Sequence, residues 1–234
     1  MVMRTFPISP YIITFLLSFV ISFIIVFILL LKKGIEPRFI GYSMLLNIVL
    51  ILYGAKLYTT ISSGFQYNLL NAGPSSLGGV VGLFIGIFIF GRIYTKYQKV
   101  FLQAYTLVIP LMYSIAKIGC YLTGCCHGIP YKGPMAISYH NDLLQGGPYF
   151  PIQLTETIIF AIIFLIGVGM YFSKQNYQVV PVTMILCAVG KFSLEYLREE
   201  HAGTLLSTNQ WVCIGFFLWG IILILQNNKS SKGL

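Results

Sequence analysis

Residues Tyr11–Leu31 read YIITFLLSFVISFIIVFILLL, a run without a charged side chain that ends at Lys32-Lys33. About 20 apolar residues in a helix are enough to cross the hydrocarbon core of a bilayer. The run is longer than the roughly 7–15 residues of a signal-peptide core, and basic residues rather than a small-residue cleavage site follow it. We therefore interpret it as a retained first transmembrane helix.

The composition extends this interpretation to the whole chain. Only 9% of the 234 residues are charged and 57% are hydrophobic, with a mean hydropathy of +0.82, whereas a soluble domain carries about 25% charged residues. The net charge of +9 does not indicate nucleic-acid binding, because the basic residues stand at the ends of apolar runs instead of in one cluster. We predict a single membrane-embedded domain over residues 1–234, with no nucleic-acid partner.

Apolar segments along the chain predict seven transmembrane helices and an all-α fold, since open strands cannot satisfy their backbone hydrogen bonds in hydrocarbon. The segments are Tyr11–Leu31, Phe39–Thr60, Leu77–Tyr94, Val100–Gly119, Pro151–Phe172, Val179–Leu197 and Asn209–Gln226.

Basic residues in the connections predict the orientation, because cytoplasmic loops are enriched in Lys and Arg. One set of loops carries Lys32, Lys33, Arg38, Arg92, Lys96, Lys99, Lys174, Lys229 and Lys232. The opposite set carries only Arg4, Lys132 and Arg198. We expect the N-terminus outside and the C-terminus in the cytoplasm.

Two connections on the predicted outer side are expected to form the mouth of a cavity. Residues 61–76 are uncharged and rich in Gly, Ser, Tyr and Asn. Residues 120–150 form the longest loop, and a long loop in a compact protein is usually functional or disordered. Its reactive side chains are Cys120, Cys125, Cys126, His127, His140 and Asp142. We interpret it as an ordered functional loop.

Ionisable residues inside the predicted spans indicate a functional site, because charge is costly in hydrocarbon. They are Lys56, Lys117, Glu156, Lys191 and Glu195. Lys191, Glu195 and Arg198 are spaced i, i+4 and i+7, so they share one helix face. Such a group suits an anionic lipid headgroup, since Arg binds phosphate bidentately. The alternative is that Lys191–Glu195 and Lys117–Glu156 are structural ion pairs and that Arg198 and Lys56 extend to the interface.

The segment from Lys117 to Gly128 concentrates glycines and thiols. It contains Gly119, Cys120, Gly124, Cys125, Cys126, His127 and Gly128. Its glycines disfavour a regular helix throughout and favour a tight turn. Adjacent Cys125 and Cys126 do not easily bind one ion, so we predict no metal site and no cofactor. A packed turn, a disulfide from Cys120 to Cys125 or Cys126, and a thiol activated by His127 or Lys117 remain open.

Five motifs in order carry a family resemblance. They are Gly78-Gly79, Lys117 through Gly128, Phe150-Pro151-Ile152-Gln153-Leu154-Thr155-Glu156, Lys191-Phe192-Ser193-Leu194-Glu195-Tyr196-Leu197-Arg198, and Ser207-Thr208-Asn209-Gln210. Their order and spacing resemble those of the prolipoprotein diacylglyceryl transferases of bacterial inner membranes. The resemblance implies a seven-helix enzyme that moves a diacylglyceryl group from phosphatidylglycerol to a cysteine thiol of a preprolipoprotein signal peptide, with glycerol 1-phosphate leaving.

The resemblance also implies roles for individual residues. The expected catalytic group is Lys117, Arg198, Glu195, His127 and Cys125. The expected substrate-binding group is Gly78, Gly79, Cys120, Gly124, Gly128, Gln153, Glu156 and Lys191. Arg198 would hold the lipid phosphate, and Lys117 would stand where the family has an essential arginine.

The chain departs from the family pattern at five positions. Lys117 replaces an arginine, Cys120 an asparagine, Cys125 a glutamate, and Leu77 and Phe150 two histidines. His127 is a possible replacement for the lost bases. The competing hypothesis is a protein of the same fold with a cysteine-based redox or metal centre, or with a different acceptor. A transporter is disfavoured, because no inverted repeat is visible.

Overall fold

The computed structural model describes residues 9–139, 147–201 and 205–232, so Arg4, His140 and Asp142 lie outside the described residues. In this part of the chain, seven helices are long and apolar enough to cross a membrane. They are α1 (Pro10–Lys32), α2 (Pro37–Ser62), α3 (Ser76–Ile93), α4 (Gln98–Thr123), α5 (Ile152–Tyr171), α6 (Val179–Glu195) and α7 (Thr208–Lys232). Three short 3₁₀ turns accompany them, η1 (Thr95–Tyr97), η2 (Asn176–Gln178) and η3 (Glu199–His201). The prediction of an all-α, multi-pass membrane protein is confirmed.

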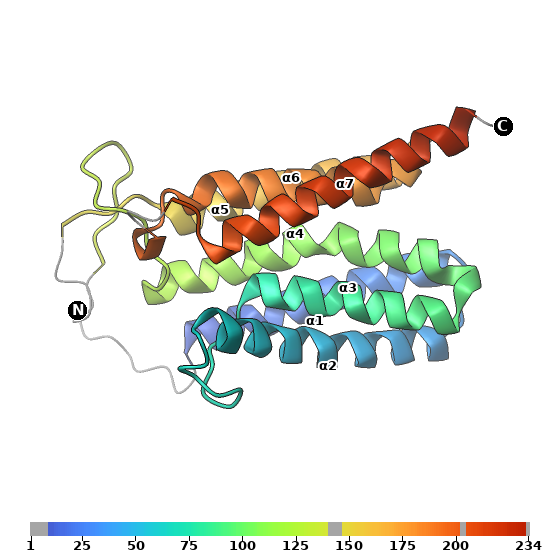
Figure 1. Ribbon diagram of the computed structural model, residues 1–234, viewed down its shortest axis with the longest axis horizontal. Coiled ribbons are helices and arrows are strands. Elements are labelled where there is room, and N and C mark those ends of the chain that lie inside the picture. The colour runs from blue at the N-terminus through green and yellow to red at the C-terminus, as the bar shows by residue number, and fades with distance from the viewer. Residues whose placement is uncertain (1–8, 140–146, 202–204, 233–234) are drawn as a thin grey trace.

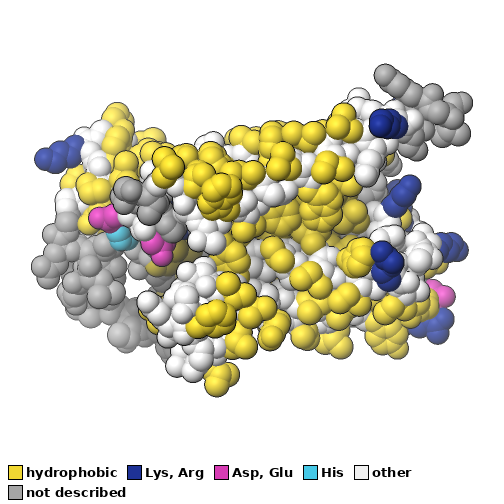
Figure 2. Space-filling view, viewed as in Figure 1, with side chains coloured by type: hydrophobic (Ala, Val, Ile, Leu, Met, Phe, Trp, Pro, Cys, Tyr) yellow, Lys and Arg dark blue, Asp and Glu magenta, His cyan; other side chains and the backbone are white. Residues whose placement is uncertain are grey.

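The helices run along the long axis of the molecule and leave two unlike ends (Figure 1). The loop end holds the α2–α3, α4–α5 and α6–α7 connections, and the basic end holds the shorter α1–α2, α3–α4 and α5–α6 connections. Figure 2 shows hydrophobic side chains over the surface between the ends and most of the visible Lys and Arg side chains at the basic end. This distribution is that of a bundle with lipid around its middle.

Proline and glycine mark several of the helix ends. Pro10 and Pro37 open α1 and α2 at positions where a missing backbone N–H costs nothing. Gly124 ends α4 with a left-handed φ of 71°, a conformation that glycine adopts without steric cost. The expectation of a turn from Gly119 onward is therefore wrong in part, because α4 continues through Gly119. A Cβ at Gly119 would collide with the Thr14 hydroxyl of α1, so this glycine permits close helix packing.

Helices α2 and α3 approach each other closely through glycines. A Cβ on Gly82 would collide with the carbonyl oxygen of Leu50, and one on Gly78 would collide with Cβ of Tyr58. Lipid tails are as apolar as leucine side chains, so helices in a membrane associate through close packing instead of through the hydrophobic effect. The α2–α3 pair is held in this way. Gly78 thus serves helix packing.

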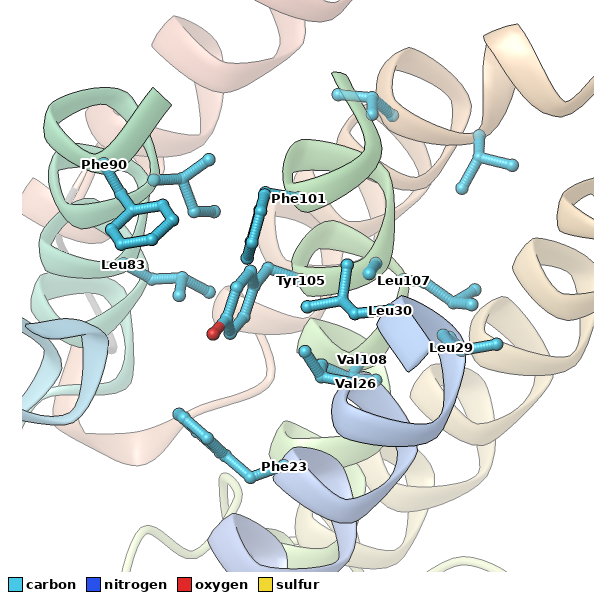
Figure 3. Close-up of a cluster of buried hydrophobic side chains, with 14 of the residues drawn as sticks. Phe23, Val26, Leu29, Leu30, Leu83, Phe90, Phe101, Tyr105, Leu107 and Val108 are labelled. Carbon is cyan, nitrogen blue, oxygen red and sulfur yellow. The ribbon is translucent and has the colours of Figure 1, made fainter. Parts of the chain in front are cut away.

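An apolar core fills the part of the bundle nearer the basic end (Figure 3). Phe101 and Tyr105 of α4 lie beside Val26 and Leu30 of α1, and all four are at most 1% exposed. The Tyr105 hydroxyl shares a 2.8 Å hydrogen bond with Ser43 of α2. This core ties α4 to α1 and α2, and the buried charged residues of α4, α5 and α6 lie nearer the opposite end.

Candidate active site

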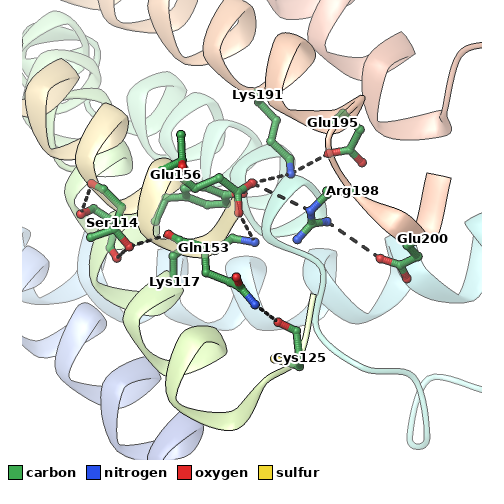
Figure 4. Close-up of polar contacts among 12 residues, drawn as sticks. Ser114, Lys117, Cys125, Gln153, Glu156, Lys191, Glu195, Arg198 and Glu200 are labelled. Atoms are coloured by element: carbon green, nitrogen blue, oxygen red, sulfur yellow. Dashed lines mark hydrogen bonds and ion pairs between the residues drawn. The ribbon is translucent and has the colours of Figure 1, made fainter. Parts of the chain in front are cut away.

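Glu156 of α5 is the centre of a buried ionic cluster near the loop end (Figure 4). Its carboxylate is fully buried. Oε2 lies 2.7 Å from Nζ of Lys117, and Oε1 lies 3.1 Å from Nζ of Lys191. Nε of Arg198 is 4.0 Å from Oε1. One carboxylate therefore faces three cations, from α4, from α6 and from the turn after α6.

A second carboxylate extends the cluster toward α7 and α2. Glu195 lies one turn after Lys191 and pairs with it at 2.7 Å. The Asn209 amide donates to Oε1 of Glu195 at 2.5 Å, and the Tyr58 hydroxyl donates to Oδ1 of Asn209 at 2.9 Å. Because these side chains come from three helices, the network fixes α2 and α7 against α6 at this level.

The cluster carries a surplus positive charge. Among the buried groups, Lys117, Lys191 and Arg198 supply three positive charges, and Glu156 and Glu195 supply two negative ones, which leaves one (3 − 2 = +1). The exposed Glu200, 3.9 Å from Nη1 of Arg198, is outside this count. Lys117 and Lys191 each have a carboxylate oxygen within 2.7 Å, whereas Nε of Arg198 stands 4.0 Å from Glu156. The surplus is therefore concentrated at Arg198.

Arg198 is held charged and only partly satisfied. Burial is the largest influence and lowers the pKa of its guanidinium, but the surrounding negative charges, that of Glu156 foremost, together raise the pKa above its ordinary value. Among the described residues, its buried Nε–H has no hydrogen-bond acceptor. Its Nη1 lies 3.9 Å from the exposed Glu200. At 6% exposure, Arg198 does not extend to the interface as the alternative interpretation expected.

A cavity of about 540 Å³ adjoins the cluster and has two chemically different parts. Its polar part is lined by Lys117, Lys191, Arg198, Asn209, Cys120 and Cys126. Its apolar part is lined by Phe15, Phe19, Leu83, Phe84, Met184 and Phe216. The α2–α3 connection contributes residues 73–75 to the lining. Such a cavity suits an amphiphile with an anionic head.

The α4–α5 connection is anchored beside this cavity. The Ile129 N–H donates to the carbonyl of Leu197 at 3.0 Å, and Gly128 forms a bridge with Arg198. A Cβ on Gly128 would come within 2.5 Å of the carbonyl oxygen of Phe150, so only glycine fits. The Gln153 amide donates to the carbonyl of Cys125 at 2.9 Å. The loop thus positions the cysteines and the backbone of Arg198 together.

The three cysteines of this segment form a compact group of free thiols. The Sγ atoms of Cys120, Cys125 and Cys126 all lie within 4.8 Å of one another. Although Cys125 and Cys126 are adjacent, their sulfur atoms lie in one group, and Cys126 has a left-handed φ of 56°. The prediction of no metal site stays a prediction. Hydrogen bonds from the Cys120 and Cys125 thiols lower the pKa of the Cys126 thiol, and the charges of Lys117 and Arg198 lower it further.

Some predicted site residues lie away from the cavity lining. Nδ1 of His127 pairs with Glu199 at 2.8 Å, and its ring packs on Tyr149 at 4.8 Å between centroids. His127, Cys125 and Gly78 are absent from the lining, whereas Gly79 contributes to it. Gly124, Gly128 and Gln153 shape the loop instead of facing the cavity. The cavity brings together Lys117, Lys191, Arg198 and Cys120.

Tyr113 and Lys56 have roles that the sequence did not show. The Tyr113 hydroxyl donates to Oε1 of Glu156 at 2.5 Å, and its ring lies 5.1 Å and 5.6 Å from Nζ of Lys117 and Lys191. Its position one turn before Lys117 on α4 was the signal that could have found it. Lys56 donates to the carbonyls of Leu69 and Leu70 and so holds the α2–α3 connection.

Comparison with known proteins places these features in a family. A family profile described as prolipoprotein diacylglyceryl transferase matches residues 1–226. Phosphatidylglycerol–prolipoprotein diacylglyceryl transferase 2 of Clostridium perfringens (strain 13 / Type A) is 33% identical over 141 residues, which are 56% of this chain and 54% of that protein. The phosphatidylglycerol–prolipoprotein diacylglyceryl transferase of Clostridium tetani (strain Massachusetts / E88) is 27% identical over 159 residues, 62% of this chain and 61% of that protein.

A third relative, of the same name, comes from Polynucleobacter necessarius subsp. necessarius (strain STIR1). It is 25% identical over 178 residues, 71% of this chain and 65% of that protein. The chain thus spans between about half and two thirds of the length of these curated relatives. Since the family profile covers nearly all of its residues, the chain belongs to the prolipoprotein diacylglyceryl transferase family.

Proposed function

We propose that the protein transfers a diacylglyceryl group from phosphatidylglycerol to the cysteine thiol of a prolipoprotein. The observation that carries the proposal is the surplus positive charge at Arg198 beside an amphiphilic cavity. A phosphodiester headgroup carries one negative charge, which matches the +1 of the cluster. The acyl chains would lie along the apolar part of the cavity. The names of the relatives state the same donor and acceptor for those proteins.

The cluster supports the chemistry through electrostatic stabilisation. As the acceptor sulfur attacks the diacylglyceryl carbon, the carbon–oxygen bond breaks and negative charge grows on the departing glycerol phosphate. Arg198 would meet that charge with its guanidinium fork, and Lys117 would add a second positive charge. Glu156 positions both cations instead of touching the lipid, since its carboxylate is fully buried between them.

The proposal includes an orientation. The basic end would face the cytoplasm of a bacterial cell and lie in its inner membrane, as the excess of Lys and Arg there favours. Residues 61–76 and 120–150 would then border the cavity mouth at the outer face. In this orientation, the cavity meets lipid of the outer leaflet and a signal peptide emerging from the membrane. Single cysteines at Ser173 and at Lys132, each in a variant whose five native cysteines are replaced by serine, are labelled with a membrane-impermeant maleimide to test it. Only the variant with Lys132→Cys is expected to react in intact cells.

The activity is tested with purified protein in liposomes that contain labelled phosphatidylglycerol and a lipobox peptide. We expect the wild type to transfer label to the peptide and Arg198→Ala to lose at least about 100-fold in rate, as for loss of a transition-state donor. Lys132→Ala is the matched control, because Lys132 is an exposed cation of the same loop end. Its rate should equal that of the wild type.

Arg198→Lys separates charge from geometry. It keeps the positive charge and loses the bidentate fork, so an intermediate rate is expected. No transfer by the wild type above a protein-free background, with a peptide that a family enzyme does modify, would refute the proposed function. Equal rates for the wild type and Arg198→Ala would refute the role of the cluster.

A further inference from the structure

The thiol group of Cys120, Cys125 and Cys126 has no part in the ionic network around Glu156. Cys120 and Cys126 line the cavity, and Cys125 stands on its exposed side. The group therefore lies at the boundary between the cavity and the α4–α5 connection. Three clustered thiols at the edge of a substrate cavity need a role beyond packing, because a packed turn does not require sulfur.

We propose that these three cysteines bind a zinc-class divalent ion whose fourth coordination position opens into the cavity and receives the acceptor thiol. The inference rests on the proposed function for the identity of the fourth ligand, but not for the metal site itself. Zinc sites that act in catalysis keep three protein ligands and one open position, whereas structural sites are closed by four.

The sulfur positions fit such an ion after a small adjustment. A Zn–S bond of about 2.3 Å in tetrahedral geometry places the sulfurs about 3.8 Å apart. In the structure, the three Sγ atoms all lie within 4.8 Å of one another. Each sulfur–sulfur distance therefore has to contract by no more than about 1 Å, which side-chain rotation supplies.

The surroundings hold the ligands in place. The Gln153 amide fixes the carbonyl of Cys125 at 2.9 Å, and the Thr123 hydroxyl lies 3.4 Å from Sγ of Cys125. Hydrogen bonds from surrounding groups orient the residues that coordinate a metal ion directly, and they are a usual part of metal sites. His127, the neighbouring residue that is able to close the site, pairs with Glu199 instead. The fourth position is therefore left to a ligand from the cavity.

The charges of the two clusters are complementary. Three thiolates and one divalent cation sum to −1 (−3 + 2), and the adjoining ionic cluster carries +1. Cys126 lines the same cavity as Lys117 and Arg198. An occupied metal site would thus lie beside the residues that are proposed to bind the lipid phosphate, and it would place the nucleophile and the phosphate side by side.

Such an ion would take over the deprotonation of the acceptor thiol, for which the chain lacks the two histidines that Leu77 and Phe150 replace. The acceptor thiol loses its proton to cavity water when it coordinates, because a coordinating thiol is deprotonated at neutral pH. Its sulfur electron pair then forms the carbon–sulfur bond, and the carbon–oxygen bond breaks with its electrons on the glycerol phosphate. The thioether product binds zinc more weakly than a thiolate does, so it leaves. No oxidant or reductant is required.

The metal site is tested first by stoichiometry, without reference to activity. Purified protein is incubated with zinc, freed of excess ion, and its metal content measured by mass spectrometry. We expect one zinc per chain, lost in Cys126→Ser and in Cys120→Ser and retained in Cys213→Ser, which changes a buried cysteine of α7 outside the group. Less than about a tenth of an equivalent in the wild type, or unchanged zinc in Cys126→Ser, would overturn the metal site.

The open position is tested with cobalt, whose thiolate complexes absorb in the near ultraviolet. The Co²⁺-loaded protein should gain about one third in its sulfur-to-cobalt absorption when a lipobox peptide is added, and nothing with a peptide in which serine replaces the cysteine. An unchanged spectrum with a peptide that is known to bind would overturn the acceptor assignment.

The two proposals fail in different ways. Zinc bound at one equivalent without any lipid transfer would leave the metal site standing and refute the enzyme. Full transfer by metal-free protein in the presence of a chelator would refute the role of the metal in activating the acceptor thiol and leave the enzyme. Circular dichroism of the cysteine variants excludes loss of fold as the cause of lost zinc.

Discussion

Helix α4 passes through two unlike halves of the bundle. Near the basic end, Phe101 and Tyr105 lie in a core of aromatic and aliphatic side chains. Further along the helix, Tyr113 and Lys117 lie in a cluster of buried charges. The same helix is therefore held against its neighbours by close packing of apolar side chains in one half and by balanced buried charges in the other.

The difference matters because removing one side chain affects the stability of the two halves in different ways. In the apolar half, each side chain contributes contacts that are lost one at a time, and a neighbour is able to relax into the space. In the ionic half, removing one partner leaves the remaining ones buried with an unbalanced charge, which costs more than the contact itself. The apolar half should thus tolerate conservative changes that the ionic half does not.

The largest expected effect comes from Glu156→Gln. The change removes the carboxylate that faces Lys117, Lys191 and Arg198, and it raises the cluster charge from +1 to +2. We expect the free energy of unfolding to fall by about 3–5 kcal/mol, the usual cost of breaking a buried ion pair by one partner. Equilibrium unfolding in mixed micelles with increasing dodecyl sulfate measures it.

A double variant shows whether charge balance is the cause. Glu156→Gln with Lys117→Met restores the cluster to +1, so it should recover a substantial part of the lost stability. If the double variant is as unstable as the sum of the two single variants, the two residues do not interact and the contrast between the halves is wrong.

The fold was predictable from the sequence because hydropathy alone specifies it. Each later helix, like the run Tyr11–Leu31, corresponds to an apolar segment long enough to cross a membrane. Helix α1 begins at Pro10 and ends at Lys32, so each end differs by one residue from the predicted run. The end of α4 was not predictable, because glycine at 119 both weakens a helix and permits close packing against α1. Only the position of Thr14 in space decides between these effects.

The charged part of the site was predictable because a charged side chain inside a span is costly enough to require buried partners. Helical spacing placed Lys191, Glu195 and Arg198 on one face, and the structure brings them to Glu156. The sulfur group was not predictable, since the spacing of the cysteines along the chain does not show that their Sγ atoms come within 4.8 Å of one another. The partnership of Asn209 with Glu195 depends on how α7 packs on α6, which the spacing along one helix does not contain.

Tyr113→Phe should have the next largest effect on stability. The hydroxyl donates to a carboxylate, and hydrogen bonds to charged groups contribute about 1.5–3 kcal/mol. The ring stays beside Lys117 and Lys191, so their cation–π contacts are retained. The same unfolding measurement applies. A loss below about 0.5 kcal/mol would mean that Lys191 alone satisfies this oxygen of Glu156 and that the ionic half is more adaptable than its buried charges imply.

Tyr105→Phe is the matched change in the apolar half and should have the smallest effect. It removes the hydrogen bond between the Tyr105 hydroxyl and Ser43. Ser43 still donates to the carbonyl of Ile40 at 2.8 Å, so no buried donor loses its acceptor. A neutral side-chain hydrogen bond between membrane helices contributes about 0.6 kcal/mol on average, and we expect a loss of that size. Because both tyrosines lie on α4 and both changes delete one oxygen, the ratio of the two losses isolates the effect of the charged partner. A ratio near one would show that buried charge adds nothing to a hydrogen bond in this bundle, and that shape alone holds both of its halves.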